Sequence, residues 1–247
     1  MFHVDMTGRK EQREEFFAGM GVPERTEFIP DEFQKEAVRL STGGHDTLVV
    51  APTGSGKTFI ATQAIEATLE LGLRAVYTTP LKALSNTKFT EFKARFEPKY
   101  RVGLLTGDRK IEGDAHVVVA TTEIYRNELY RGDGRFSLVV LDEVHFIGDQ
   151  QRGPVWEEAI ILTPLSATLL MLSASISNSK EIAEWISHVR GKSCEIVTKT
   201  ERPVALRYGF IHPDLGIVPL ETKDQKVNRD VIHYYGEGRR ENRRRRR

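Results

Sequence analysis

The chain has 247 residues, of which 39% are hydrophobic and 29% charged, an ordinary balance for a globular protein. A chain of this length can bury a core without disulfide staples, and its single cysteine, Cys194, excludes an internal disulfide and a cysteine metal cluster. We expect a small buried thiol and a reducing, cytoplasmic location. No run approaches the roughly 18 apolar residues of a membrane span, so we expect a soluble protein without a membrane partner, and nothing indicates an oligomer.

The net charge of +1 is unevenly distributed along the chain. Residues 239–247 contain seven arginines and one glutamate, a sum of +6, so the remainder carries +1 − 6 = −5. The overall charge therefore does not indicate a nucleic-acid-binding protein, and any contact with RNA or DNA has to come from local groups.

Short apolar runs alternate with helix-like segments along most of the chain. The predicted strands are 47–50, 75–79, 101–105, 116–120, 138–141, 168–172 and 195–197. The predicted helices are 31–40, 57–71, 81–96, 123–130, 156–162 and 180–188. Several strands are apolar at successive positions, which is typical of strands buried on both faces. The pattern predicts an α/β, three-layer domain with a mostly parallel central sheet flanked by helices.

This rhythm also predicts the domain boundaries. We expect an N-terminal lead-in at 1–22, the α/β domain at 23–203, and a linker strand with a disordered arginine-rich tail at 204–247. Consecutive like charges repel one another, which is the reason for expecting disorder at the tail. Ligands of such domains bind beyond the carboxyl ends of the strands.

A glycine-rich loop follows the first apolar strand directly and opens the next helix. Its residues are Ala51, Pro52, Thr53, Gly54, Ser55, Gly56, Lys57 and Thr58. Glycines at 54 and 56 let backbone N–H groups turn toward phosphate oxygens, and the helix dipole favours the same anion. Lys57 is expected to contact the β- and γ-phosphates of ATP, and the Thr58 hydroxyl is expected to bind Mg²⁺. A chance glycine-rich turn is the alternative.

A pair of acids ends a later apolar strand, at the edge of the sheet where the glycine-rich loop is expected. Asp142 is the expected Mg²⁺ ligand, and Glu143 the group that orients and deprotonates the attacking water. His145 can donate and accept a hydrogen bond at once and so can link the site to a neighbouring loop. A solvated loop is the alternative for such acids.

With these motifs in order, residues 28–203 resemble the superfamily-two helicases of the DExH-box type, and within them the superkiller-like RNA helicases that work with exosomes. The resemblance implies a RecA-like P-loop NTPase fold, ATPase and helicase activity, and ATP and Mg²⁺ as cofactors. It assigns adenine recognition to Phe28 and Gln34, and the coupling of hydrolysis to strand movement to Ser173, Ala174 and Ser175. Simpler explanations are also possible for these residues. Phe28 could pack in the core, Gln34 could be a surface amide, and residues 173–175 could form a capping turn.

The resemblance also assigns contacts to the nucleic-acid backbone. The residues concerned are Pro80, Lys82, Ala83, Gly107, Asp108, Thr121, Thr122 and Arg126. Small and polar residues at strand ends present N–H groups to phosphates, so binding should tolerate any base sequence. A solvated Lys82, a salt-bridged Arg126 and helix N-capping by the two threonines are the simpler explanations.

The resemblance implies a second RecA-like domain as partner, which supplies arginine fingers to the ATP site. We expect this polypeptide alone, as a piece of a longer helicase, to bind ATP·Mg weakly, hydrolyse it slowly and not unwind a duplex. Single-stranded RNA is the expected nucleic-acid partner, with DNA as the alternative because no residue that would read the 2′-hydroxyl is identifiable in the sequence. An ATP-switched module that binds RNA or protein without unwinding is the alternative function.

Overall fold

The computed structural model describes residue 11 and residues 14–18, 29–132, 135–204, 206–212, 215–221 and 226–244, the side chains of residues 237–244 excepted. Contacts divide the chain into two units. One is Ile29–Pro203; the other combines Met1–Phe28 with Val204–Arg247. Phe28, the expected adenine contact, lies outside the described residues.

The larger unit is built on an eight-stranded sheet with the strand order β4-β3-β5-β2-β6-β7-β1-β8. The strands are β1 (Asp46–Val50), β2 (Ala75–Thr79), β3 (Val102–Thr106), β4 (Arg109–Ile111), β5 (Val117–Thr121), β6 (Leu138–Leu141), β7 (Thr168–Ser173) and β8 (Cys194–Thr198). Every pairing is parallel except that of β4 with β3. The strands β2, β5, β3, β6, β7 and β1 therefore end at one common edge of the sheet.

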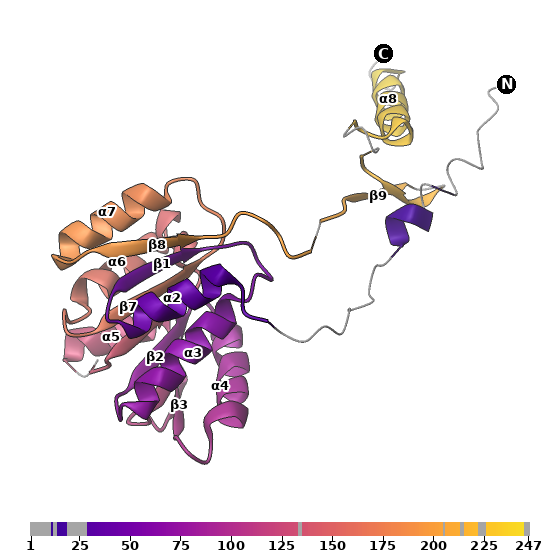
Figure 1. The fold of residues 1–247 in the computed structure, drawn as a ribbon. Coiled ribbons are helices and arrows are strands. Elements are labelled where there is room, and N and C mark those ends of the chain that lie inside the picture. The colour runs from indigo at the N-terminus through magenta and orange to yellow at the C-terminus, as the bar shows by residue number, and fades with distance from the viewer. Residues whose placement is uncertain are drawn as a thin grey trace. The chain divides into compact units, whose positions relative to one another are not determined.

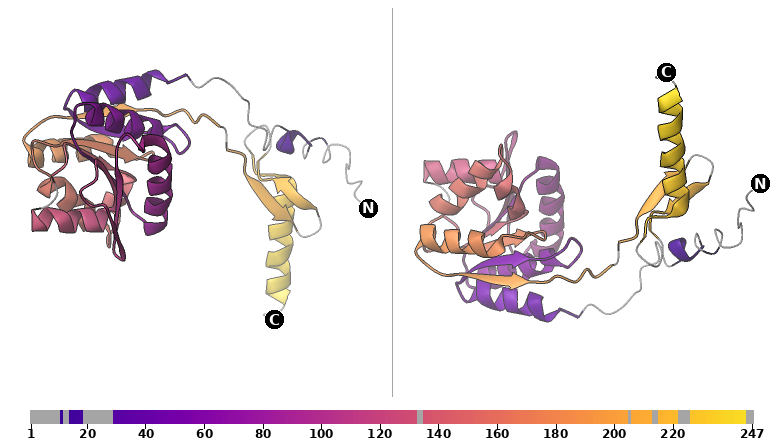
Figure 2. Two further views of the ribbon diagram at one scale, coloured as in Figure 1. Left: turned by 90° about the horizontal axis from the view of Figure 1, so that it is seen from below. Right: turned by 90° about the horizontal axis from the view of Figure 1, so that it is seen from above.

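Helices cover both faces of this sheet (Figures 1 and 2). On one face lie α2 (Glu32–Thr42), α3 (Lys57–Glu70) and α4 (Lys82–Phe96). On the other lie α5 (Thr122–Arg131), the short 3₁₀ helix η1 (Val144–Gly148), α6 (Gly153–Leu162) and α7 (Ser179–Arg190). The predicted three-layer α/β architecture is confirmed.

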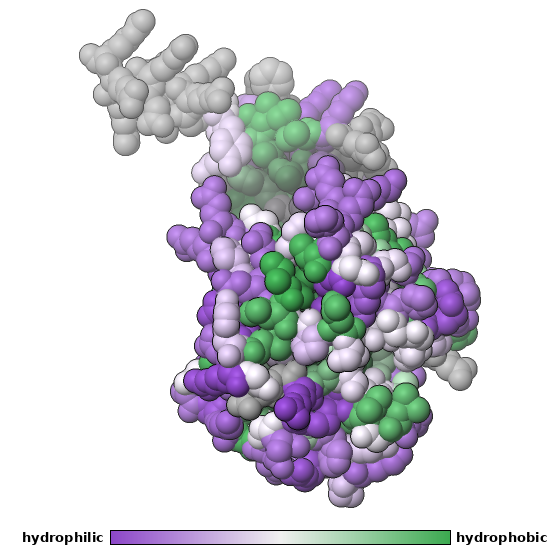
Figure 3. Space-filling view, turned by 90° about the vertical axis from the view of Figure 1, so that its left-hand side faces the viewer, coloured by the Kyte–Doolittle hydropathy of each residue, from purple (hydrophilic) through white to green (hydrophobic). Residues whose placement is uncertain are grey.

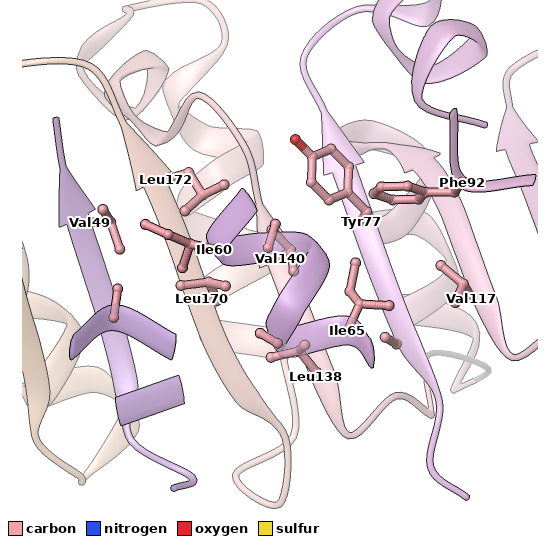
Figure 4. Packing of buried hydrophobic residues seen from close by; sticks show 14 of the residues in the cluster. Val49, Ile60, Ile65, Tyr77, Phe92, Val117, Leu138, Val140, Leu170 and Leu172 are labelled. Atoms are coloured by element: carbon pink, nitrogen blue, oxygen red, sulfur yellow. The ribbon is translucent and has the colours of Figure 1, made fainter. Parts of the chain in front are cut away.

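The core explains why the apolar runs become strands. Successive residues of a strand point to opposite faces, so Val49 packs under α3 while Leu48, its neighbour, packs under the other helix layer. Figure 4 shows Ile60 and Ile65 of α3 directed onto the strands of the sheet. Hydrophilic side chains dominate the face shown in Figure 3, with smaller hydrophobic patches between them. No helix in the described part of the chain is long and apolar enough to cross a membrane.

The predicted strands are present with their ends within one residue, and the predicted helices with ends shifted by three residues at most. The largest shift is the start of α6 at Gly153 rather than Trp156, where a proline in the first turn is compatible with a helix start. The sequence patterns did not predict β4 or η1. The strand β4 is short and largely exposed, so it lacks the apolar run that marks the others.

The smaller unit contains a two-stranded antiparallel sheet and a helix: β9 (Gly209–His212), β10 (Gly216–Pro219) and α8 (Arg229–Arg244). The only described strands in the range expected to hold a linker strand, 204–247, are β9 and β10, which pair with each other. The helix α8 is described as far as Arg244, and residues 245–247 lie outside the described residues, so the disordered arginine-rich tail stays a prediction. Arginine is a good helix former, and here it extends a helix that is already nucleated.

Candidate nucleotide and nucleic-acid site

The loop between β1 and α3 has the backbone conformation expected of a phosphate loop. Gly54 and Gly56 have φ of 86° and 82°, in the left-handed region that only glycine adopts without strain. Gly56 is the N-cap of α3, so the helix begins with its free N–H groups at the loop. The sequence Gly-Ser-Gly-Lys-Thr therefore folds into a concave turn at the positive end of a helix dipole, a favourable place for an anion.

Gln34 of α2 is part of the framework of this loop. Its side chain is 4% exposed, and its Nε2 donates to the carbonyl oxygen of Ser55 at 2.9 Å. Its Oε1 accepts from the backbone N–H of Asp31 at 2.9 Å, which closes a capping box at the start of α2. A Cβ placed on Gly56 would lie 2.3 Å from Gln34 Nε2. Gln34 is therefore a buried support of the loop and not a surface amide.

Lys57 folds back over the loop. Its Nζ donates to the carbonyl oxygens of Ala51 at 2.8 Å and of Pro52 at 3.1 Å. Burial lowers the pKa of the lysine, and the charges of Glu143 and Asp142 oppose that shift. The ammonium group is thus held at the loop and faces the electrostatic field of the two acids, which come from a different strand.

Asp142 is held by Tyr77, a residue that was not among the expected site residues. Tyr77 of β2 is fully buried, and its Oη donates to Asp142 Oδ2 at 2.5 Å. Burial raises the pKa of Asp142, the hydrogen bond from Tyr77 lowers it, and the neighbouring Glu143 raises it. Figure 4 shows the ring of Tyr77 beside that of Phe92 of α4. The ring packs as core and its hydroxyl orients the acid.

Glu143 has φ of 58°, one of two described non-glycine residues with positive φ. Such a conformation is strained and is concentrated at functional sites. Its backbone N–H donates to Asp142 Oδ1 at 3.0 Å, which supports the turn. His145 Nδ1 lies 3.2 Å from Glu143 Oε2, within ion-pair distance. This buried nitrogen has no hydrogen-bond partner among the described residues.

Ser173, at the end of β7, lies between the two halves of the site because β7 separates β1 from β6 in the sheet. Its register partner is Val50, and its carbonyl oxygen accepts from the N–H of Ala51 at 3.2 Å. Ser173 is buried, whereas Ala174 is half-buried and Ser175 is exposed. The segment thus runs from the phosphate loop to the surface, and the N-cap residue of the following helix α7 is Asn178.

The residues expected to contact nucleic acid are brought to the same edge by β2, β3 and β5. The hairpin between β3 and β4 presents Gly107 and Asp108, both exposed. Lys82, at the start of α4, forms an ion pair with Asp108, and the lysine holds the pKa of that carboxyl below its ordinary value. Ala83 is exposed, but Pro80 is buried, so any contact at 80 has to come from the backbone.

Two further expected contacts have structural partners. Thr122 is fully buried, and its Oγ1 donates to the carbonyl oxygen of Thr79 at 3.3 Å, tying α5 to β2. Thr121 is the N-cap residue of α5, but its side chain makes no capping hydrogen bond. Arg126 pairs with Glu158 of α6 at 3.2 Å, so its simpler explanation, a salt bridge, is present. Trp156 is fully buried, as expected of a core residue.

The loop fits the phosphates of a nucleotide. Ser55 Oγ and Ser173 Oγ are buried, and neither has a hydrogen-bond partner in the part of the chain that the structure describes. Buried polar atoms are normally paired, so unpaired hydroxyls beside a helix N-terminus suit an anion. Thr58 is exposed at the first turn of α3, and Asp142 lies at the end of β6. These are oxygen ligands of the kind that Mg²⁺ prefers.

Comparison with known proteins identifies the family. Residues 31–183 match the family model described as the DEAD/DEAH box helicase. The chain belongs to this family. The expected resemblance to DExH-box helicases of the superkiller-like group is thereby confirmed, because the similar proteins include members of it.

Three of these helicases show how far the similarity extends. The chloroplastic DExH-box ATP-dependent RNA helicase DExH15 of Arabidopsis thaliana is 46% identical over 85% of this chain and 18% of its own length. The antiviral helicase SKI2 of Saccharomyces cerevisiae is 42% identical over 72% of this chain and 14% of its own. The exosome RNA helicase MTR4 of Homo sapiens is 41% identical over 75% of this chain and 18% of its own length. The chain thus spans less than a fifth of the length of these relatives.

A solved structure supports the fold. The helicase MrfA bound to DNA has a TM-score of 0.59 to this chain, with 19% sequence identity, and the match covers 76% of this chain and 29% of that one. At that identity the similarity concerns the fold alone, and it agrees with the RecA-like architecture expected from the sequence.

Proposed function

We propose that this chain is the N-terminal ATP-binding lobe of an RNA helicase. It binds ATP·Mg and the backbone of single-stranded RNA, and it couples hydrolysis to strand movement when a second RecA-like domain completes the cleft. The observation that carries the proposal is the convergence of the phosphate loop, the Asp142–Glu143 turn and Ser173 at one edge of the sheet. Phosphoryl transfer needs positioning and charge neutralisation above all, and this edge supplies groups for both.

Each group has a defined role in this proposal. The loop N–H groups and Lys57 bind the phosphates, and bound Mg²⁺, held by Thr58 and Asp142, would neutralise developing negative charge. Tyr77 keeps the Asp142 carboxylate oriented through its hydrogen bond. Glu143, whose backbone has a positive φ, takes the proton of the attacking water.

RNA is the proposed substrate because two of the relatives named above are RNA helicases by the words of their names. Lys82 would exchange its partner Asp108 for a phosphate, and Gly107 leaves the adjoining backbone open. Thr121 and the start of α5 supply N–H groups of the kind that bind phosphates without reading bases. The cytoplasmic location stays a prediction, and one relative is named as chloroplastic.

The test is ATP hydrolysis with and without single-stranded RNA, by the wild type, Lys57→Ala and Glu143→Gln. We expect RNA to stimulate the wild type, Lys57→Ala to lose nucleotide binding, and Glu143→Gln to bind ATP while turnover falls by about 10²-fold or more, the contribution of a general base. Lys93→Ala, a change in an exposed ion pair of α4, is the control and should behave as the wild type.

Two outcomes would replace the proposal. Nucleotide binding without any turnover that depends on Glu143 would identify an ATP-switched binding module. Competition in which single-stranded DNA displaces RNA at equal concentration and equal salt would remove the preference for RNA.

A further inference from the structure

Asp142 is bonded to β2 twice, once through its side chain and once through its backbone. Its Oδ2 accepts from Tyr77 Oη at 2.5 Å, and its own N–H donates to the carbonyl oxygen of Thr78 at 3.1 Å. These partners are consecutive residues of one strand, and both are fully buried. The position of the Asp142 carboxylate therefore depends on the position of β2.

The end of β2 is also the point to which the expected nucleic-acid contacts are attached. Thr79, the last residue of the strand, shares a buried hydrogen bond with Ser85 of α4, with 2.7 Å between the two hydroxyl oxygens. The carbonyl oxygen of Thr79 accepts from Thr122 Oγ1 at 3.3 Å, which ties α5 to the same residue. Lys82, an expected RNA contact, is the first residue of α4. The starts of α4 and α5 are thus both fastened to the strand that holds Asp142.

The helix α4 reaches Tyr77 by a second route, through aromatic packing. The ring of Phe92 lies edge-on to that of Tyr77 at 5.3 Å between centroids, and it packs in turn on Phe96 at 5.5 Å. All three side chains are buried, and Figure 4 shows the rings of Tyr77 and Phe92 side by side. Because a protein core is close-packed, a shift of α4 along the sheet has to move the tyrosine ring.

We propose that Tyr77 is the positioning residue through which RNA bound at the end of β2 sets the Asp142 carboxylate for Mg²⁺. RNA that fixes the start of α4 also fixes the tyrosine ring, and the hydroxyl then holds Asp142 Oδ2 in one place. By linkage the effect is reciprocal, so the same bond makes RNA bind more tightly when Mg²⁺ and nucleotide are bound. This inference rests on the proposed function and adds a physical route from the RNA contacts to the metal site.

The first test measures this reciprocal effect on binding, without catalysis. Binding of a fluorescently labelled oligouridylate is followed by anisotropy, with no nucleotide and with a saturating non-hydrolysable ATP analogue in excess Mg²⁺. We expect the nucleotide to tighten RNA binding by the wild type about fivefold or more, the low end of typical coupling. In Tyr77→Phe, which keeps the ring and removes the hydroxyl, we expect the ratio of the two RNA affinities to fall below about two.

The excess of Mg²⁺ separates coupling from a purely local role of the tyrosine. If Tyr77 only orients Asp142, the Tyr77→Phe variant needs more Mg²⁺ to bind the nucleotide, but at saturation it shows the same ratio as the wild type. A ratio in Tyr77→Phe equal to that of the wild type would therefore overturn the proposal.

Tyr125→Phe is the matched control for the loss of a buried hydroxyl. Tyr125 is 1% exposed, and its hydroxyl is hydrogen-bonded to Thr163 at 2.9 Å, on the other face of the sheet. Both variants should lose some stability in thermal melting, since each leaves a hydrogen-bond partner unpaired. Only Tyr77→Phe should lose the coupling ratio. An equal loss of the ratio in Tyr125→Phe would show a general loosening of the fold and overturn the assignment to Tyr77.

Two further measurements test the ring contact and the metal. Phe92→Leu keeps the Tyr77 hydroxyl but removes the ring contact, so we expect a smaller ratio, whereas Phe136→Leu, which alters the ring beside Tyr125 at 6.3 Å, should keep it. With EDTA in place of Mg²⁺, a saturating concentration of the nucleotide should leave the RNA affinity of the wild type unchanged. A ratio that persists in the wild type without the metal would overturn the route through Asp142.

The failure of this inference and the failure of the proposed function give different results. A wild type that binds neither RNA nor nucleotide, or whose turnover does not depend on Glu143, would contradict the proposed function and remove the basis of the inference. Binding of both ligands and turnover that depends on Glu143, with no effect of one ligand on the affinity for the other, would leave the proposed function standing and overturn the coupling through Tyr77 alone.

Discussion

Gly56 is subject to two physical constraints at once. Its φ of 82° is strained for any residue with a side chain, and a Cβ there would lie 2.3 Å from Gln34 Nε2. We expect Gly56→Ala to displace Gln34 from Ser55, open the phosphate loop and weaken nucleotide binding by about tenfold or more, since the loop N–H groups lose their orientation. Binding of a fluorescent ATP analogue and thermal melting measure the two effects.

The matched control is Gly44→Ala. Gly44 has a nearly equal φ of 84°, but nothing lies within 4 Å of its added Cβ. The left-handed conformation costs roughly 1–2 kcal/mol in either variant. Both should therefore lose stability, and only Gly56→Ala should lose nucleotide binding. Equal nucleotide affinities in the two variants would show that the contact with Gln34 does not shape the loop.

Asp142 illustrates a conflict between stability and function at one carboxyl. Burial raises its pKa in the folded chain, so the stability it contributes is present below its ordinary value of 3.8 and is lost as the pH rises through the raised value. At neutral pH the ionised carboxylate is a net cost. We expect Asp142→Asn to melt a few degrees above the wild type at pH 7, with the difference shrinking as the pH falls, while ATP hydrolysis is lost.

Asp108 supplies a control of opposite sign. Lys82 lowers its pKa, so this exposed carboxylate contributes stability above its ordinary value of 3.8 that is lost as the pH falls through the lowered one. Asp108→Asn should leave the melting temperature at pH 7 unchanged or lower it slightly. A melting temperature of Asp142→Asn below that of the wild type at pH 7 would contradict the argument from burial.

Motifs could place the loop and the acids of the site, but not the contacts that hold them. The sequence Gly-Ser-Gly-Lys-Thr after a strand predicts a phosphate loop on its own. The bonds from Gln34 to Ser55 and from Tyr77 to Asp142 span 21 and 65 residues. Such pairings depend on strand order. A signal for Tyr77 existed, since a tyrosine in a buried central strand needs a partner for its hydroxyl.

Among the elements, the central strands were predictable and the smaller ones were not. Strands buried on both faces have continuous apolar runs, so β1, β6 and β7 stand out in the sequence. The short β4 contains two charged residues, and β9 is only partly buried. Their pairing is decided by neighbours in space and not by a pattern along the chain.

The base of β1 is held by a buried ion pair between two elements. Asp46 and Arg190 are both almost completely buried, and Arg190 Nε lies 2.5 Å from Asp46 Oδ2. The guanidinium also donates to the carbonyl oxygens of Thr163 at 2.8 Å and Ala167 at 2.9 Å. The group thus connects α7 with the loop between α6 and β7.

Removal of one partner should be costly. We expect Arg190→Met to lower the free energy of unfolding by about 3–5 kcal/mol, because it leaves a buried carboxylate with only the partly exposed Lys192 as cation. Urea denaturation followed by circular dichroism measures it. Arg39→Met, which breaks the exposed pair with Glu36, should cost less than about 1 kcal/mol. Similar losses in the two variants would contradict the role of burial.

At the scale of the whole molecule, the phosphate loop, the Asp142–Glu143 turn and the segment 173–175 all lie in one unit, Ile29–Pro203. They form one wall of the expected cleft. In phosphoryl transfer, an arginine finger contributes on the order of 10³–10⁵ to the rate, and the resemblance to the DExH-box helicases assigns these arginines to a second RecA-like domain. The arginine-rich C-terminal segment belongs to the other unit.

We therefore expect the 247-residue polypeptide to hydrolyse ATP slowly, to be stimulated by single-stranded RNA, and not to separate a duplex. Phosphate release and displacement of a labelled strand from a duplex with a single-stranded overhang are the measurements, with Glu143→Gln as the background for both. Slow hydrolysis that vanishes in Glu143→Gln, without strand displacement, would agree with one wall of the cleft working alone. Robust strand displacement by the wild type that Glu143→Gln abolishes would show that this polypeptide needs no second RecA-like domain for unwinding. The role that the resemblance assigns to such a domain would then be wrong.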